Sequence, residues 1–317
     1  MHRSKLSFDK FLWSGVVKLA AVGLLLSGGF ATRSMAQQQG QKTFPTAEDA
    51  SNALFTAVRS GDEKAMLEIL GSDGKQVVSS GDEAEDTQNR ANFAQKYQEM
   101  HRLVKEPDGM TTLYIGAENW PTPIPLVNKG NAWYFDTDAG KQEILYRRVG
   151  ENEISTIRVC QELVAAEKEF KSAQHDEYAH KIFSDEGRHD GLYWKAADGQ
   201  PQSPIGPLVA AAFVGENGNN QQGAPAPFHG YYFRILTHQE KNGQGSEKIA
   251  FLAYPAEYGS SGVMTFLVNE DGVVYQKDLR KKTDELAKTM KLSSTHPGWQ
   301  KAEEQQEEPA TEQKTNP

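Results

Sequence analysis

Four short runs in the last third of the chain are rich in β-branched and aromatic residues and are separated by turn signals. They cover residues 231–236, 249–254, 263–268 and 273–279. Gly243–Gly245 and Asn269–Gly272 supply the Gly- and Asn-rich turns that join neighbouring antiparallel strands. Consecutive strands with short links form an antiparallel meander, and one face of such a sheet has to be covered. The pattern predicts a four-stranded antiparallel meander.

A long helix is predicted before this sheet. Asn152 can cap it, and apolar residues then recur at helical spacing to about Lys181. The stretch 185–222 is rich in Gly, Pro and Asn, which is typical of an extended crossover. We therefore expect the long helix to pack on the meander.

The first half changes from helical to strand-like periodicity. Thr46 and Asp49 form an acidic variant of the capping box at the start of a helix that ends near Val58. Two more helices are expected over 65–70 and 86–104. Short strand candidates follow at 111–116, 124–128, 132–136 and 143–148. The predicted fold class is α+β, with N-terminal helices and a curled antiparallel sheet, then the long helix and its meander.

The N-terminus has the three parts of a secretory signal peptide. Met1–Lys18 is basic, Leu19–Ala31 is an apolar run of 13 residues, and Ser34 and Ala36 are small residues at the positions that signal peptidase reads. The alternative is a retained anchor, but a membrane span needs about 20 apolar residues. The sequence predicts cleavage after Ala36 and a periplasmic or secreted protein.

These patterns divide the chain into four parts. They are a signal peptide over 1–36, an α+β domain over 37–150, a helix-plus-sheet domain over 151–300, and a tail over 301–317. The tail consists mainly of Glu, Gln, Lys and Pro and is expected to be disordered. The boundary is placed near Gly150, and each domain is expected to bury its own core.

The charge balance argues against several classes of partner. The whole chain has a net charge of −9, and removal of residues 1–36, with five basic residues and one acidic residue, leaves −13. Nucleic acids and anionic lipid surfaces bind clustered Lys and Arg, and the longest such run here is Arg280–Lys282. We expect no nucleic-acid partner and no transmembrane segment after signal cleavage.

Cys160 is the only cysteine, so the chain has no internal disulfide. It lies on the apolar side of the predicted long helix. No cation flanks it to lower the pKa of its thiol, so it is expected to be a buried, unreactive residue.

Candidate catalytic and metal sites are weak. Gly259–Gly262 lacks the spacing of a nucleophile elbow, and His175 and His180 are too far apart in sequence for one helix face. Asp136–Gly140 favours a hairpin turn over a calcium loop. Glu151 and Glu153 could act as an acid–base pair, but a helix N-terminus would also stabilise them. We predict no catalytic residue, no metal site and no cofactor.

Paired aromatic residues near turns are the best candidates for a binding surface. Neighbours along a strand point to opposite faces, so one ring of each pair is expected to be exposed or to cover a groove. The predicted binding residues are Tyr193, Trp194, Tyr231, Tyr232, Tyr254 and Tyr258.

Several distinctive blocks resemble a family of exported bacterial proteins known as a domain of unknown function. They are Asp190–Trp194, Ser203–Val209, His229–Leu236, Tyr254–Phe266, Asn269–Asp278, Phe135–Gly140 and Arg147–Glu153. The resemblance extends from about Phe44 to Trp299. It implies no activity and no catalytic residue.

Each half of the chain also has a resemblance of its own. The order of helices and sheet in the first half resembles the cone of the nuclear-transport-factor-like superfamily. The second half is similar to the globular head of type IV pilins, with a Gly-Tyr-Tyr-Phe strand from Gly230 and an Ala-Tyr-Pro strand end at Pro255. It lacks the long apolar N-terminal helix through which pilins polymerise.

Together these patterns predict a non-catalytic binding or structural protein of the bacterial cell envelope. Its partner would be an envelope protein or a small ligand. The alternative is a periplasmic hydrolase or small-molecule enzyme with its site in the N-terminal cone. A cavity with a buried carboxylate or histidine would favour the enzyme, and a filled cone would favour the binding protein.

Overall fold

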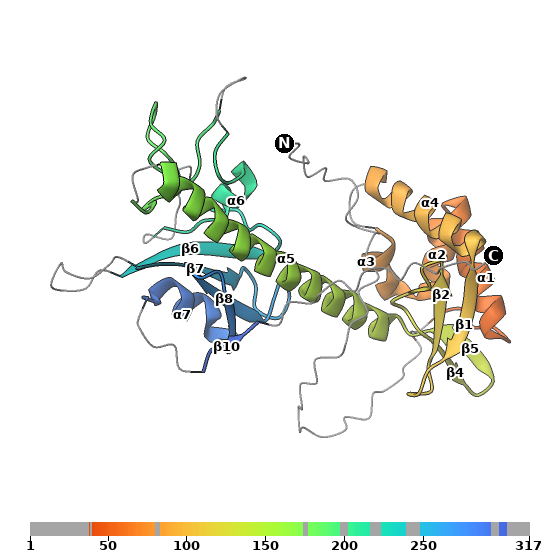
Figure 1. Cartoon of the computed structure of the whole chain (residues 1–317). Helices are drawn as coiled ribbons and strands as arrows, with labels where there is room; N and C mark the ends of the chain where they lie inside the picture. The colour runs from red at the N-terminus through yellow and green to blue at the C-terminus, as the bar shows by residue number, and fades with distance from the viewer. Residues whose placement is uncertain are drawn as a thin grey trace, which may run out of the picture. The chain divides into compact units, whose positions relative to one another are not determined.

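The computed structural model describes residues 38, 40–79, 83–173, 177–196, 202–215, 223–238, 248–292 and 298–302. The chain divides into two compact units, one ending at Ile144 and the other beginning at Leu145 (Figure 1). The predicted signal peptide and the tail beyond Ala302 lie outside the described residues. The unit boundary falls six residues before the expected one at Gly150, and independent folding of the two parts stays a prediction.

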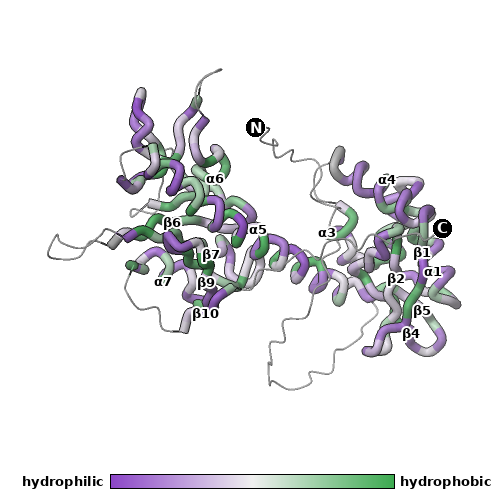
Figure 2. Tube along the Cα trace, viewed as in Figure 1, coloured by the Kyte–Doolittle hydropathy of each residue, from purple (hydrophilic) through white to green (hydrophobic). Residues whose placement is uncertain are grey.

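Helices make up the start of the first unit. They are α1 (Ala47–Ser60), α2 (Glu63–Leu70), α3 (Lys75–Val78) and α4 (Glu83–Glu99). The expected cap at Thr46 is confirmed, because its hydroxyl accepts a hydrogen bond from Asp49 N at 3.0 Å. The sequence of α4 is largely hydrophilic (Figure 2). The third helix was expected to reach Val104, but it ends at Glu99, and Val104 lies in a strand.

An antiparallel sheet follows these helices. It contains β1 (His101–Lys105), β2 (Thr111–Ile115), β3 (Trp120–Pro121), β4 (Leu126–Lys129) and β5 (Ala132–Phe135). The order is β1-β2-β4-β5, with β3 paired to β2. Buried Leu126 and Phe135 form a common core with α1 and α2. Tyr97 of α4 packs with Leu113 and Ile115 of β2 in a second cluster.

The long helix α5 runs from Thr137 to Ala173. The predicted strand over 143–148 and the predicted helix start at Asn152 are therefore wrong. The physical reason is a cap at Asp136, whose carboxylate accepts a hydrogen bond from Ala139 N at 3.0 Å. The segment Asp136–Gly140, expected as a hairpin turn, is the beginning of this helix. Glu151 and Glu153 consequently lie in the middle of α5.

The expected meander is confirmed in the second unit and gains a fifth strand. Its strands are β6 (Tyr231–His238), β7 (Lys248–Pro255), β8 (Met264–Asn269), β9 (Val274–Asp278) and β10 (Gln300–Lys301), in the order β10-β9-β8-β7-β6. Lys301 was assigned to the tail, but it pairs with Tyr275, and Ala302 is buried.

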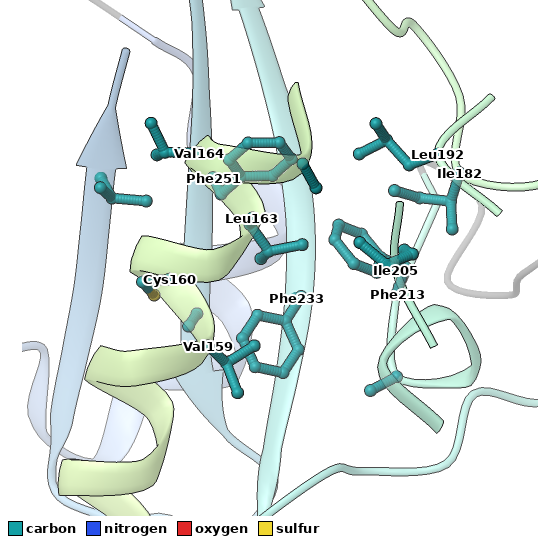
Figure 3. Close-up of a cluster of buried hydrophobic side chains, with 14 of the residues drawn as sticks. Val159, Cys160, Leu163, Val164, Ile182, Leu192, Ile205, Phe213, Phe233 and Phe251 are labelled. Carbon is teal, nitrogen blue, oxygen red and sulfur yellow. The ribbon is translucent and has the colours of Figure 1, made fainter. Parts of the chain in front are cut away.

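The second sheet is covered on both faces. On one face, side chains from α5 meet those of β6 and β7 (Figure 3). The labelled contacts include Val159, Cys160, Leu163, Val164, Phe233 and Phe251. On the other face, Ala287 of α7 (Thr283–Thr289) packs with Leu252 and Tyr254. The short helix α6 (Pro207–Ala211) lies within the segment that was expected to be extended. These units confirm the α+β class.

In the part of the chain that the structure describes, no helix is both long enough and apolar enough to span a membrane.

Candidate functional site

Two of the predicted binding tyrosines belong to the core. Tyr231 and Tyr254 are each 0% exposed. Tyr231 belongs to the cluster on one face of the second sheet, and Tyr254 belongs to the cluster on the other face. The expectation that Tyr231 and Tyr254 take part in a binding surface is wrong, because α5 covers one face of the sheet and α7 covers the other. Neither tyrosine can form part of a binding surface in this fold.

Tyr231 instead links β6 to the start of β8. Its hydroxyl donates a hydrogen bond to Met264 O at 2.9 Å, and burial raises the pKa of this phenol. A Cβ atom at residue 262 would lie 2.1 Å from the Tyr231 hydroxyl oxygen. Gly262 is therefore required by the close contact with this ring.

We expect Gly262→Ala to lower the free energy of unfolding by at least about 1–3 kcal/mol, because the added methyl group overpacks the site of a fully buried ring. Gly150→Ala is the matched control. Gly150 lies inside α5 with open space around its Cα, so alanine there should stabilise the protein by about 1 kcal/mol. Urea unfolding of both variants measures the two effects, and equal stabilities would contradict this packing.

The loop after β7 is anchored to α5. Glu153 Oε1 accepts hydrogen bonds from Val263 N at 2.8 Å and Met264 N at 2.9 Å. Asn152 donates its side-chain amide to Ser261 O at 2.9 Å. Glu153, considered as half of an acid–base pair, thus holds the start of β8. The loop that was expected to bind a partner is positioned by these contacts.

Tyr232 and Tyr258 are half-buried. The Tyr232 ring packs near Tyr254, with their centroids 5.9 Å apart. The Tyr258 hydroxyl donates to Asp278 Oδ2 at 3.4 Å. Binding through these two residues stays a prediction.

Tyr193 and Trp194 line a shallow depression of about 470 Å³. Tyr193 meets Phe183 edge to face, and Trp194 stacks on His189 with centroids 4.1 Å apart. All residues that line the depression come from the single stretch 183–195. Tyr232 and Tyr258 do not line this depression, and Tyr231 and Tyr254 are buried, so the six predicted residues do not form one surface.

Two acidic residues near this depression share one lysine. Lys181 Nζ lies 2.8 Å from Asp185 Oδ2 and 3.0 Å from Asp190 Oδ2. His175, the other member of the weighed metal region, lies outside the described residues. Across the described ranges, no three His, Cys, Asp or Glu side chains are grouped as a metal site would require. Cys160 is fully buried, as expected, and desolvation raises the pKa of its thiol to about 12.

The strongest candidate site surrounds Glu167, a residue that sequence reasoning missed. Helix α5 directs Glu167 into the interior, where it is only 4% exposed. Leu163 and Phe170, one turn away on either side, are also buried. Glu167 Oε1 accepts a hydrogen bond from Ala179 N at 2.6 Å. The second carboxyl oxygen, Oε2, is buried and has no hydrogen-bond partner among the described residues.

Glu167 lines a pocket of about 240 Å³. Unlike the depression at Trp194, it is assembled from separate parts of the second unit. Its walls come from α5, the segment after α5, β7, and the end of β8 with its turn. The lining residues are Val164, Glu167, Lys168, Lys171, Tyr178, Ile249, Phe251, Asn269 and Glu270. This pocket, which we call the Glu167 pocket, therefore depends on the tertiary fold.

Polar side chains of the Glu167 pocket fall into two groups. Tyr178 donates a hydrogen bond to Glu270, and Lys171 Nζ lies 4.2 Å from the centre of the Tyr178 ring. These three residues satisfy one another. Asn269 Oδ1 differs, because in the described part of the chain it is buried without a hydrogen-bond partner, as is Glu167 Oε2. The pocket thus contains two unpaired acceptor oxygens.

Burial changes the protonation of Glu167. Desolvation raises the pKa of its carboxyl group from 4.5 to about 7, against smaller opposing effects of the Ala179 N–H and Lys171. Near neutral pH the group therefore exists in both forms. A strongly perturbed carboxyl group in a pocket is typical of a functional site, where it can bind a cation, donate a hydrogen bond or transfer a proton.

The sequence did contain a signal for this residue. Leu163, Glu167 and Phe170 have the spacing of one helix face, so Glu167 occupies a position that the apolar pattern assigns to the core. A glutamate at such a position is almost never fully buried without a partner. The partner segments, however, come from residues far along the chain.

Comparison with known proteins gives the family. No curated protein and no solved structure matches the chain. The resemblances to the pilin head and to the transport-factor cone therefore stay predictions. One family model covers residues 41–302, which is most of the chain and all of both sheets. The chain belongs to the family described as "Protein of unknown function (DUF2950)".

Proposed function

We propose that this chain is exported to the bacterial cell envelope, where it acts as a non-catalytic binding protein with its ligand site in the Glu167 pocket. The observation that carries the proposal is the buried, unpaired Glu167 Oε2 in the wall of a pocket. An unsatisfied buried acceptor costs about 1–3 kcal/mol, and a ligand that donates a hydrogen bond removes this cost. The basic, apolar and small-residue pattern over 1–36 supports export.

Packing in the first unit supports binding over the enzyme with a site in the N-terminal cone. The inward side chains Leu113 and Ile115 of β2 are 0% exposed and pack against Tyr97. The Tyr97 hydroxyl is itself satisfied by Ser51 and Asn52. These side chains pack together between α4 and β2, in the domain whose cone was considered for an enzyme site.

One observation favours an alternative, in which the Glu167 pocket is an active site. A carboxyl group with a pKa of about 7 suits general acid–base catalysis at neutral pH. Among the described residues, those that line the pocket include no serine, threonine, cysteine or histidine. Nucleophilic attack by those common groups would thus need a residue from elsewhere, and for this reason we favour binding.

The experiment is recovery of bound small molecules from the mature protein after incubation with envelope extract, followed by mass spectrometry. Glu167→Leu removes the carboxyl group, and Glu162→Gln is the control, since Glu162 is an exposed glutamate of the same helix. We expect a compound that copurifies with wild type and with Glu162→Gln and that is lost with Glu167→Leu. Equal recovery from all three proteins would place the site elsewhere. Turnover of the captured compound would favour the enzyme.

Export makes a separate prediction. We expect the mature N-terminus to be Gln37, because Ser34 and Ala36 follow a short apolar run after a basic start. N-terminal analysis of the protein from envelope fractions measures this directly. A mature protein that retains Met1–Ala36 would contradict signal cleavage.

A further inference from the structure

We propose that the Glu167 pocket binds a small zwitterion, namely a free amino acid with an apolar side chain. Its ammonium group would meet Glu167 and Asn269, and its carboxylate would face Lys168. This inference rests on the proposed binding function and adds the chemical class of the ligand.

The unpaired oxygens indicate a ligand that donates hydrogen bonds. Glu167 Oε2 and Asn269 Oδ1 are both acceptors, and both are buried without a partner. An ammonium group carries three donors and no acceptor, so it can donate hydrogen bonds to more than one acceptor. It also gains a charge-assisted hydrogen bond to ionised Glu167, which is stronger than a neutral one. An alcohol has a single donor and leaves one oxygen unpaired.

The apolar wall indicates a hydrocarbon part next to the ammonium group. Val164, Ile249 and Phe251 line the pocket and are themselves buried. The volume of about 240 Å³ exceeds that of an apolar cavity of about 150 Å³ that binds benzene. A branched aliphatic side chain can therefore bury its surface here, gaining about 0.8 kcal/mol for each CH₂ group.

The charges around Glu167 indicate an acidic group at the other end of the ligand. Lys168 and Lys171 line the pocket from α5, while Tyr178 and Glu270 line it from the facing segments. Glu270 accepts the Tyr178 hydrogen bond, and Lys171 lies over the Tyr178 ring. Lys168 is exposed and takes part in neither contact. A carboxylate on the ligand would pair with the positive charge of Lys168. An amine without a carboxylate would add a second positive charge near Lys168 and offer that lysine no partner.

The protonation of Glu167 predicts the direction in which ligand affinity changes with pH. An ammonium ligand prefers the ionised carboxylate, so binding releases a proton and lowers the pKa of Glu167. With a pKa of about 7 in the free protein, the ionised fraction rises about tenfold between pH 6 and pH 8. Affinity should rise by the same factor. A ligand that binds through a carboxylic acid would require protonated Glu167, and its affinity would fall instead.

The test is titration calorimetry of the mature chain with three probes that share one hydrocarbon body. They are leucine, 3-methylbutylamine, which lacks the carboxylate, and 4-methylpentanoate, which lacks the ammonium group. We expect leucine to bind most tightly, with about tenfold higher affinity at pH 8 than at pH 6. Binding of none of the probes, equal or tighter binding of 4-methylpentanoate, or an affinity that falls with pH would overturn the inference.

Two variants test the roles of Glu167 and Lys168 separately. Glu167→Gln should abolish the pH dependence of leucine binding, and Glu162→Gln should leave it unchanged. Lys168→Met, at an exposed position, should weaken leucine binding and leave 3-methylbutylamine unaffected. An unchanged leucine affinity in Lys168→Met would overturn the zwitterion. Capture of another compound that depends on Glu167, without leucine binding, would overturn this ligand class but leave the proposed binding function intact.

Discussion

Phe233→Ala is expected to lower the free energy of unfolding by about 3–5 kcal/mol. Phe233 lies on β6 and is 0% exposed, in the core between α5 and the second sheet. Its ring centroid is 5.8 Å from that of Phe213. Truncation removes the contacts of the whole ring and leaves a cavity, because α5 and the neighbouring strands cannot collapse into it. Urea unfolding, followed by circular dichroism, measures the loss.

Tyr146→Ala is the control for this prediction. Tyr146 also carries a large aromatic ring, but it is 60% exposed. Its removal should change the stability by no more than about 0.5 kcal/mol. If both variants lose less than about 1 kcal/mol, the proposed core between α5 and the sheet is wrong.

The second large effect is a dependence of stability on pH through Glu167. Its pKa is raised in the folded state from 4.5 to about 7. In this window the folded chain holds a proton that the unfolded chain has released. Stability therefore falls as the pH rises from 4.5 to about 7, and it is level above that. The shift corresponds to about 3 kcal/mol over the whole window.

Glu167→Gln removes this titration while its side-chain oxygen can still accept the Ala179 N–H. Relative to wild type, the variant should gain about 3 kcal/mol of stability between pH 4.5 and pH 8. Glu162→Gln, on the exposed side of α5, should follow the wild-type curve. Unfolding midpoints across this pH range test the difference. Parallel curves for wild type and Glu167→Gln would show that Glu167 has an ordinary pKa.

The second sheet could be predicted from sequence because its signals are local. Each strand carries its own β-branched and aromatic run, and the Asn269–Gly272 turn lies between β8 and β9. The strand β10 could not be found in this way. Its pairing with β9 brings together residues that lie more than 20 positions apart.

The start of α5 was missed because its first turn contains turn-forming residues. Asp136 was interpreted as part of a hairpin, although the same side chain is a helix cap. Gly140 and Gly150 also lower the helical propensity of this stretch. In the folded chain, a Cβ at residue 140 would lie 2.6 Å from an Ile124 side-chain atom, so the glycine serves close packing.

The binding residues were predicted least well, because exposure is a tertiary property. Alternation along β6 correctly separated Tyr231 from Tyr232. It could not show that α7, which was not predicted, covers the face on which Tyr254 lies. Glu167 was missed for a different reason, since a glutamate on a helix is normally assigned to the surface. Its burial follows from contacts with segments up to about 100 residues away.

The central claim is that the second unit holds a ligand pocket with a buried, unpaired carboxyl group at Glu167. The most direct measurement is an NMR titration of the side-chain carboxyl carbon of Glu167, assigned with Glu167→Gln. The structure predicts a midpoint near pH 7. A midpoint near the ordinary value of 4.5 would mean that the carboxyl group is solvated, and it would contradict the account.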